Sequence, residues 1–327
     1  MLPGVQPTRI ALVLSILVTG ILFGAANALG ADGGLLPVAP RSPNASGTSD
    51  LYVVVVAICL VGLVVIEGAL AAIVIRYRRR ARSRYADGPQ IRGSLRLHAA
   101  PVVVTALAMT AVAVVAIVKL PGIIDTPAAG AAGETSITVE GRQFYWLFRY
   151  PGGGVSVGTM VAPAGVLVHE SVVSPVDDVV HGWFVPALGG SVAAVPGETH
   201  EAWFRAPAGS YVARCTELCG IQHTRMTARV KVVSPDEYAQ FIESRAANQK
   251  SVEVGREEYA HVCATCHRLD TVFIGPALGA NPILSKLTDL TSIVRNGVGT
   301  MPAVGSDWTD EQIEALAAYT ATIVKPA

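Results

Sequence analysis

The sequence predicts a multidomain protein in which a transmembrane helical hairpin precedes an antiparallel β-sandwich and a small helical domain. Long uncharged stretches indicate the hairpin, short alternating runs broken by Pro and Gly indicate the sandwich, and a capped amphipathic segment indicates the last domain. The chain has 327 residues, more than one ordinary domain requires. With 51% hydrophobic and only 15% charged residues, it is more apolar than a typical soluble protein.

The first apolar stretch, Ile10 to Leu29, follows a single basic residue and ends in Ala26-Asn27-Ala28. This A-x-A pattern is typical of a signal-peptidase site, but the length also suits a membrane-spanning helix. We therefore expect residues 1–31 to form a signal peptide or a first transmembrane helix. Residues 32–50 are expected to form a linker.

Two further apolar stretches, Leu51 to Ile75 and Leu97 to Val118, are each long enough to cross about 30 Å of hydrocarbon as a helix. The segment between them contains eight arginines and one acidic residue, Asp87. Because positive loops stay in the cytoplasm, residues 51–120 are predicted to form a hairpin with an arginine-rich cytoplasmic loop. The rest of the chain is then expected outside.

Short alternating runs such as Ser136 to Val139 and Val166 to His169 follow the hairpin, with breaks such as Pro151 to Gly154. This pattern is typical of an antiparallel sandwich or barrel, and we predict a sandwich over residues 133–234. Ser234 then begins a helical linker over residues 235–251. In the last domain, residues 252–327, Thr309 to Gln312 match a capping box that begins an amphipathic helix ending near Ile323.

The last domain contains a C-x-x-C-H motif, Cys263-Ala264-Thr265-Cys266-His267. In this motif two thiols form thioethers with the vinyl groups of a haem, and the adjacent imidazole ligates the iron. By itself, the motif is also compatible with a zinc site or a redox-active cysteine pair.

The residues around this motif resemble those of class I cytochromes c. Gly255 and Tyr259 precede it at the spacing Gly-x-x-x-aromatic-x-x-x-Cys, and Gly275 to Leu278 resemble the family's Gly-Pro-x-Leu segment. The resemblance implies an all-α class I cytochrome c domain with covalent haem c, in which Met301 is the sixth ligand of the iron. The haem would be held by four residues: Cys263, Cys266, His267 and Met301.

The segment from Cys215 to Met226 contains two thiols, an imidazole and a thioether. Soft ligands of this kind select copper. A mononuclear blue-copper site needs only one cysteine, so the second thiol favours two bridged copper ions. Structural zinc is the alternative, but a thioether is a poor zinc ligand.

This segment resembles the binuclear copper A loop of cytochrome c oxidase subunit II, and Asp178 to Pro186 resemble the family's Asp-Val-x-His-x-Trp-x-Val-Pro. The resemblance implies a cupredoxin-like sandwich in which Cys215 and Cys219 bridge two coppers. It further implies that His181 and Met226 complete one copper, while His223 and the Glu217 carbonyl complete the other. The Glu217 carboxylate would also reach a magnesium ion shared with the catalytic subunit.

With its C-terminal cytochrome, the chain is similar to subunit II of caa-type bacterial oxidases. The resemblance implies a multi-pass protein of the bacterial cell membrane that passes electrons to catalytic subunit I, in a complex that reduces O2 and translocates protons. Its partners would be the other oxidase subunits, the lipid bilayer and a donor cytochrome or upstream respiratory complex. Acids outnumber bases nine to five from Ser251 onward, which favours a basic donor. The zero net charge gives no indication of nucleic-acid binding.

Some positions depart from the family. The family's aromatic stretch, where electrons enter the copper domain, corresponds to Phe144, Tyr145 and Trp146, and Phe144 replaces the usual exposed tryptophan. We therefore expect the fused haem to supply the electrons. In the membrane segments, His98 stands where relatives often have glutamate, and Glu67 is an acid within an apolar helix. His98 is a candidate for proton uptake because of this position, and Glu67 is a candidate because intramembrane acids are costly. Glu67 also fits an interhelical hydrogen bond.

Two other functions remain open from the sequence. The changes at His98 and Phe144 are compatible with the copper A subunit of a nitric oxide reductase, which an assay with nitric oxide would distinguish. A copper carrier or assembly protein could also use Cys and Met ligands. Such a protein needs no haem, so the C-x-x-C-H motif argues against it.

Overall fold

The structure is a computed structural model that describes residue 20 and residues 37–78, 93–128, 133–248, 250–279 and 281–323. Apart from Gly20, the expected signal peptide or first helix lies outside the described residues, as does most of the arginine-rich loop. The chain divides into two compact units. One comprises Met1–Pro40 with Ser46–Asp125, and the other comprises Arg41–Ala45 with Thr126–Ala327.

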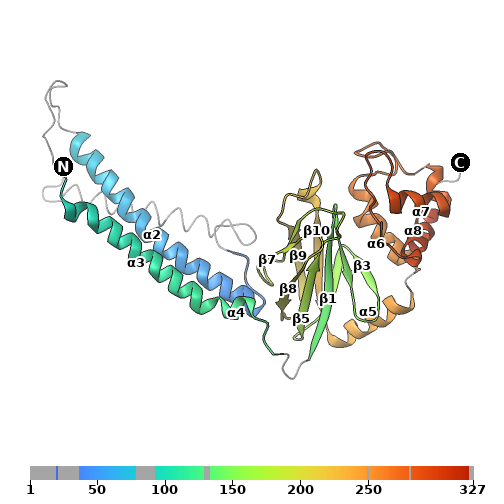
Figure 1. The fold of residues 1–327 in the computed structure, drawn as a ribbon, viewed down its shortest axis with the longest axis horizontal. Helices are drawn as coiled ribbons and strands as arrows, with labels where there is room; N and C mark the ends of the chain where they lie inside the picture. The colour runs from blue at the N-terminus through green and yellow to red at the C-terminus, as the bar shows by residue number, and fades with distance from the viewer. Residues whose placement is uncertain are drawn as a thin grey trace. The chain divides into compact units, whose positions relative to one another are not determined.

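The first unit contains most of helix α2 (Pro43–Arg78), together with α3 (Leu95–Lys119) and α4 (Pro121–Ile124) (Figure 1). Two helices of the described part of the chain are long and apolar enough to cross a membrane, and they belong to α2 and α3. An ion pair of 3.0 Å between Lys119 and Asp50 places the end of α3 beside the early part of α2. This contact fits the predicted hairpin.

Helix α2 begins at Pro43, earlier than the apolar stretch that starts at Leu51. Proline suits the first turn of a helix because its missing N–H would have no partner there. The linker expected over residues 32–50 is therefore shorter than the sequence indicated.

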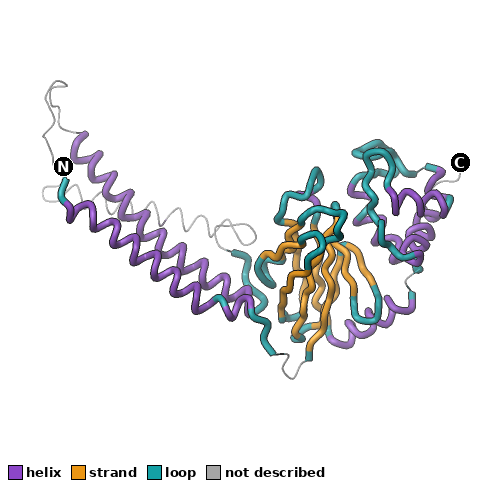
Figure 2. Tube along the Cα trace, viewed as in Figure 1, coloured by secondary structure: helices purple, strands orange, loops and turns teal. Residues whose placement is uncertain are grey.

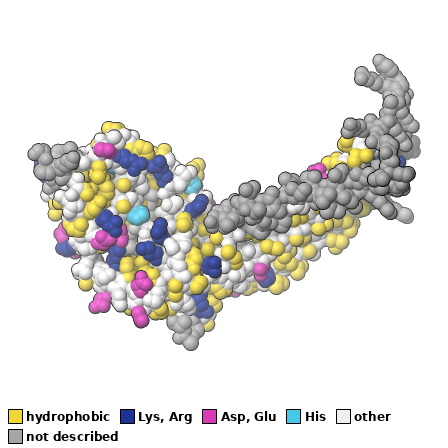
Figure 3. Space-filling view, turned by 180° about the vertical axis from the view of Figure 1, so that it is seen from behind, with side chains coloured by type: hydrophobic (Ala, Val, Ile, Leu, Met, Phe, Trp, Pro, Cys, Tyr) yellow, Lys and Arg dark blue, Asp and Glu magenta, His cyan; other side chains and the backbone are white. Residues whose placement is uncertain are grey.

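Large apolar side chains are exposed along both long helices of the first unit, and Figure 3 shows them gathered over its surface. Val102, Leu107 and Ile117 of α3 are each more than half exposed. A helix satisfies its own backbone hydrogen bonds, so an apolar helical surface of this kind suits a lipid environment.

The second unit begins with a β-sandwich of two five-stranded sheets (Figure 2). The first sheet contains, in order, β3 (Val155–Val157), β2 (Tyr145–Arg149), β1 (Glu134–Arg142), β5 (Leu167–Val173) and β8 (Thr199–Phe204). The second contains, in order, β4 (Thr159–Pro163), β10 (Thr227–Val233), β9 (Gly209–Cys215), β6 (His181–Phe184) and β7 (Ser191–Ala194).

The prediction of an entirely antiparallel sandwich was wrong for one strand pair in each sheet. Strands β1 and β5 are parallel, and so are β10 and β4. Parallel neighbours require a crossover. The chain provides one here because it passes through the opposite sheet before it returns to the partner strand.

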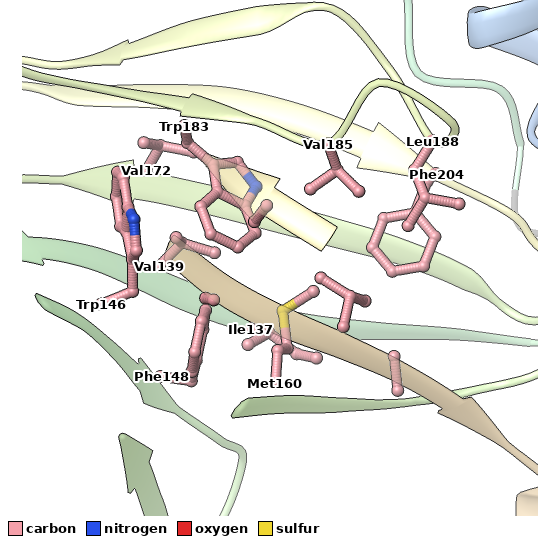
Figure 4. Close-up of a cluster of buried hydrophobic side chains, with 14 of the residues drawn as sticks. Ile137, Val139, Trp146, Phe148, Met160, Val172, Trp183, Val185, Leu188 and Phe204 are labelled. Atoms are coloured by element: carbon pink, nitrogen blue, oxygen red, sulfur yellow. The ribbon is translucent and has the colours of Figure 1, made fainter. Parts of the chain in front are cut away.

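Side chains from the inner faces of both sheets form the core of the sandwich (Figure 4). In β10, for example, Ala228, Val230 and Val232 are buried, whereas the residues that precede each of them are exposed. Burial of one large apolar side chain contributes about 1.5–3 kcal/mol. The core also includes the large aromatic residues Trp146, Phe148, Trp183 and Phe204, which are almost entirely buried.

Helices joined by loops follow the sandwich in the second unit. They are α5 (Pro235–Ala247), α6 (Val252–His261), η2 (Cys263–Thr265), η3 (Pro282–Ser285), α7 (Leu287–Asn296) and α8 (Asp310–Ile323). Ser234 caps α5 by accepting a hydrogen bond from the Glu237 N–H. The predicted capping box is confirmed, because Thr309 N–H donates to Gln312 Oε1 and Gln312 N–H donates to Thr309 Oγ1.

The sandwich and the helical region after it share a hydrophobic core, although the sequence indicated two domains joined by a linker. Tyr145, Leu147 and Val157 from β2 and β3 pack with the helical region, in a cluster that includes Tyr259 and Trp308. Alternate residues of β2 therefore face two different cores. This arrangement explains why four consecutive residues of β2 are buried.

Candidate metal centres

The copper-ligand loop, residues 215–226, lies at one end of the second sheet. Cys215 is the last residue of β9, and His181 is the first residue of β6. These strands pair antiparallel, with Trp183 opposite Cys215. Strand pairing thus brings the distant histidine to the cysteine loop, as the resemblance implied.

All six predicted copper-binding groups converge in the structure. His181, Cys215 and Cys219 are buried, and their ligand atoms lie within 4.8 Å of one another. Four contacts involve these side chains and their neighbours: His181 Nδ1 to Cys215 Sγ at 3.9 Å, Cys215 Sγ to Cys219 Sγ at 3.8 Å, Cys219 Sγ to His223 Nδ1 at 3.7 Å, and Cys219 Sγ to Met226 Sδ at 3.8 Å. The carbonyl oxygen of Glu217 lies 3.2 Å from Cys215 Sγ.

The spacing of these groups fits metal ligation. Sulfur ligands at about 2.3 Å from one ion in tetrahedral geometry are separated by roughly 3.8 Å. The Sγ atoms of Cys215 and Cys219 have a separation of 3.8 Å, and both thiols are free. The donor set of two thiols, two imidazoles and a thioether is soft, which suits copper.

The two thiols differ in their affinity for protons. The hydrogen bond between them lowers the pKa of Cys215, and the hydrogen bond with His181 lowers it further, against the effect of burial. The same hydrogen bond and burial raise the pKa of Cys219. Because thiolates are the form that binds metal, loading of the site must release the proton held by this pair.

Asp178 orients the His181 imidazole, a role that the sequence motif did not assign to it. Asp178 Oδ1 lies 3.3 Å from His181 Nε2, which leaves Nδ1 directed to Cys215 Sγ. Burial alone would lower the pKa of His181, but its contacts with Asp178 and Cys215 raise it. A carboxylate on the second ring nitrogen is the usual way in which proteins fix a histidine ligand.

The four predicted haem residues line a single cavity of about 420 Å³ in the helical region. Cys263, Cys266, His267 and Met301 all contribute to its wall, which is otherwise mostly apolar. His267 Nδ1 lies 2.8 Å from the Pro276 carbonyl, so Nδ1 carries the proton and Nε2 is free for iron.

Gly275 allows the His267 ring to pack against the backbone. A Cβ atom at position 275 would lie only 2.2 Å from His267 Cε1, so any other residue would displace the ring. Cysteines, a fixed histidine and a thioether around an apolar cavity form a donor set that fits a covalently attached haem.

The aromatic residues expected to accept electrons face three different surroundings. Phe144 lines the haem cavity. Tyr145 lies in the shared core, where Trp308 Nε1 donates a hydrogen bond of 3.1 Å to its hydroxyl. Trp146 lies in the sandwich core, with its ring centre 6.1 Å from that of His181. Together they lead from the haem cavity toward the copper ligands.

The candidates for proton uptake belong to the other compact unit. Glu67 is an exposed residue of α2, and His98 is an exposed residue of α3. His98 Nδ1 lies 2.8 Å from the Ser94 carbonyl, one helical turn earlier. The Glu217 side chain, proposed to reach magnesium, is exposed on the copper-ligand loop.

Two family models match this chain. Residues 155–233 match the periplasmic domain of cytochrome c oxidase subunit II. Residues 250–319 match subunit III of the cbb3-type cytochrome c oxidase. The first match covers the copper-ligand loop with its distant histidine, and the second covers the four predicted haem-binding residues.

Several known proteins are similar in sequence. A cytochrome c oxidase subunit 2 from Alkalihalophilus pseudofirmus is 27% identical over 308 residues, or 86% of this chain and 88% of the relative. One from Cereibacter sphaeroides is 33% identical over 148 residues, or 34% of this chain and 49% of the relative. The crystal structure of the periplasmic domain of subunit II of the Bradyrhizobium japonicum cytochrome oxidase is 28% identical, with a TM-score of 0.34, and the match covers 37% of this chain and 97% of that one.

Proposed function

We propose that this chain, which is similar to cytochrome c oxidase subunit II and carries a cytochrome c domain, conducts electrons through two metal centres to a catalytic subunit. A donor would reduce a covalent haem c, and a binuclear copper A centre would receive the electron next. The catalytic subunit would reduce O2 to water and translocate protons. The observation that carries this proposal is that both sets of ligand candidates converge within one compact unit.

In the copper centre, Cys215 and Cys219 would bridge two ions. His181 and Met226 would complete one ion, while His223 and the Glu217 carbonyl would complete the other. Two bridged ions share one electron, which keeps the structural change on reduction small. The role of the protein would be to hold the metal-ligating atoms rigidly. The burial of His181 and its contact with Asp178 support this role.

In the haem centre, Cys263 and Cys266 would attach the porphyrin, with His267 and Met301 as axial ligands in a class I cytochrome c fold. Iron with both axial positions filled by side chains transfers electrons and does not bind O2. The apolar wall of the cavity would exclude water from the ring.

The membrane hairpin and the surface of the copper-ligand loop would place the chain in its complex. Exposed apolar side chains on α2 and α3 favour a multi-pass protein of the bacterial plasma membrane. The arginine-rich segment between the helices and the match to a periplasmic domain favour copper and haem sites outside the cytoplasm. The exposed Glu217 carboxylate would share a magnesium ion with the catalytic subunit. Other oxidase subunits, a donor cytochrome or an upstream respiratory complex would be the remaining partners.

Glu67 and His98 are proposed to assist proton uptake from the cytoplasmic side. An acid within an apolar helix is costly and is therefore a candidate for function. Glu67→Gln should slow turnover of the assembled complex while both metal centres are still reduced at normal rates. Unaltered oxidase activity would show that Glu67 is structural.

The function as a whole is tested by purification of the complex that contains this chain. The optical spectrum should show low-spin haem c, and electron paramagnetic resonance should show a mixed-valence copper pair. The complex should consume O2 with a reduced cytochrome donor. Turnover with nitric oxide but not with O2 would instead assign the chain to a nitric oxide reductase.

A further inference from the structure

The turn between β1 and β2 contacts both candidate centres. Gln143 and Phe144 form this turn and line the haem cavity. The side-chain amide of Gln143 also donates a hydrogen bond of 2.6 Å from Nε2 to the carbonyl oxygen of Cys219. One side chain therefore touches the haem cavity and the backbone of a candidate bridging cysteine.

From this geometry we infer that Gln143 is the residue that couples the haem cavity to the copper centre electronically. The inference deepens the function proposed above and rests on it. The connection runs from the Gln143 amide through one hydrogen bond to the Cys219 carbonyl, and then through the covalent bonds of Cys219 to Sγ. Electrons tunnel more readily through bonds and short hydrogen bonds than across gaps, so this connection favours fast transfer.

Two other contacts could carry the electron, and each is weaker. The Phe144 ring packs against Gly220, where a Cβ atom would lie 2.8 Å from the ring, but this contact is van der Waals only. Ile221 lines the haem cavity and is joined covalently to Cys219 through Gly220. That covalent path includes two further peptide units, and the Ile221 side chain is 79% exposed. The path through Gln143 is shorter and more protected from water.

The backbone of Gln143 makes a different contact from its side chain, so the two contacts can be tested separately. Its N–H donates a hydrogen bond of 3.1 Å to Asp178 Oδ2, and the other Asp178 oxygen orients His181. Substitution of the Gln143 side chain leaves this backbone hydrogen bond available. A side-chain variant therefore tests the contact with Cys219 while His181 stays oriented.

Gln143 itself would be neither oxidised nor deprotonated. One electron leaves the reduced haem, which is oxidised, and one electron reduces the copper pair. The amide contributes a neutral donor N–H that polarises the Cys219 carbonyl and holds the copper-ligand loop against the turn.

The test uses the intact complex with both centres loaded. After photoreduction of the haem, the rate of electron transfer to copper is measured for the wild type, Gln143→Met and Gln143→Leu. Both variants lack the N–H, and we expect both to slow transfer severalfold. The copper resonance signal, the haem spectrum and both reduction potentials should stay close to those of the wild type. Ile221→Ala is the matched control, because it changes the same cavity wall without affecting the hydrogen bond, and its rate should be near normal.

Wild-type transfer rates in Gln143→Met would overturn the inference, as would a larger loss in Ile221→Ala. If Gln143→Leu disturbs the copper signal, Gln143→His, which retains an N–H donor, should restore both the signal and the rate. Failure of that rescue would also count against the inference. Absence of haem-to-copper transfer in the wild type would contradict the proposed function itself, which is a different outcome.

Discussion

The copper-ligand loop and the haem cavity use the same kinds of side chain but are built in opposite ways. Cys215, Cys219 and Met226 belong to the buried core of the sandwich, among large aromatic residues. Cys263 and Cys266 instead line a cavity of about 420 Å³, and both are only partly buried. Ligands that already form part of a packed core are held in place by the protein, whereas a group that fills a cavity becomes part of the core.

The two regions also differ in how much core they have of their own. The sandwich cluster consists of strand and loop residues, with support from α5. The cluster of the helical region includes Tyr145, Leu147 and Val157 from the sandwich. The helical region should therefore depend on both the sandwich and the haem, while the sandwich should depend on neither metal centre for its fold.

The largest expected effect comes from loss of the haem. Replacement of both attachment residues, Cys263→Ser with Cys266→Ser, should leave the helical region unfolded while the sandwich remains folded. Without the haem, the mostly apolar wall of this cavity has no packing partner. A small helical region has little stability to spare, so this loss should be enough to unfold it.

Limited proteolysis of the purified chain measures this effect. Cleavage should concentrate after α5, and a fragment that contains the sandwich should resist the protease. Cys59→Ser is the control, because Cys59 is an exposed cysteine of α2 and its loss should change nothing. A protease-resistant helical region without haem would contradict the comparison.

The second prediction sets the two kinds of sulfur ligand in the copper centre against each other. Cys219→Ser should abolish the mixed-valence copper signal, because Cys219 would bridge both ions and contacts His223, Met226 and Cys215. Met226→Leu should keep a perturbed signal, since a weak thioether only tunes such a site. The measurement is electron paramagnetic resonance of the copper-loaded chain. Equal damage from both changes would indicate a mononuclear site.

Neither change should unfold the sandwich, because each replaces one side chain of a core that also contains large aromatic residues such as Trp146 and Trp183. Circular dichroism of the two copper-free variants checks this point. Unfolding of Cys219→Ser without copper would show that the thiol contributes more to the core than to the metal site.

Much of the architecture could be predicted because its signals are local. The capping box at Thr309, the helix that follows Ser234 and the alternation from Ser136 to Val139 in β1 each depend on residues close together in the sequence. The candidate ligands from Cys215 to Met226 and from Cys263 to His267 were found because each set is contained in one short segment, whereas His181 and Met301 were assigned only from the resemblance to known families. In such motifs, the order and spacing of the residues are enough to indicate which group they bind.

Other features depend on contacts between distant segments and could not be found in this way. The hydrogen bond from Gln143 to Cys219 joins residues 76 positions apart. The parallel pairs of β1 with β5 and β10 with β4 follow from the path of the chain between sheets. The outward side chains of β2 resemble ordinary strand residues, and nothing in their order shows that a second core covers them.

The smallest expected effect is a change in the pH dependence of the stability of the sandwich. Glu170 is a fully buried carboxyl in the sandwich, and Trp183 Nε1 donates a hydrogen bond of 2.9 Å to it. Burial raises its pKa from 4.5 to about 7, although the hydrogen bond from Trp183 opposes the shift. The folded sandwich thus holds this proton more tightly than the unfolded chain does. As the pH rises from 4.5 to 7, the unfolded state releases the proton first, so the free energy of unfolding should fall across this window and level off above it.

A pKa difference of this size corresponds to about 3 kcal/mol of lost stability. Glu170→Gln keeps an acceptor for Trp183 but cannot ionise, so the sandwich of this variant should lose this pH dependence and gain relative stability at pH above about 7. The thermal unfolding midpoint of the sandwich, followed by tryptophan fluorescence on either side of the window, measures the effect. Glu201→Gln, on the neighbouring strand β8, is the control because Glu201 is exposed and should leave the pH dependence intact. An unchanged pH dependence in Glu170→Gln would mean that another titrating group causes the pH dependence of the stability of the sandwich.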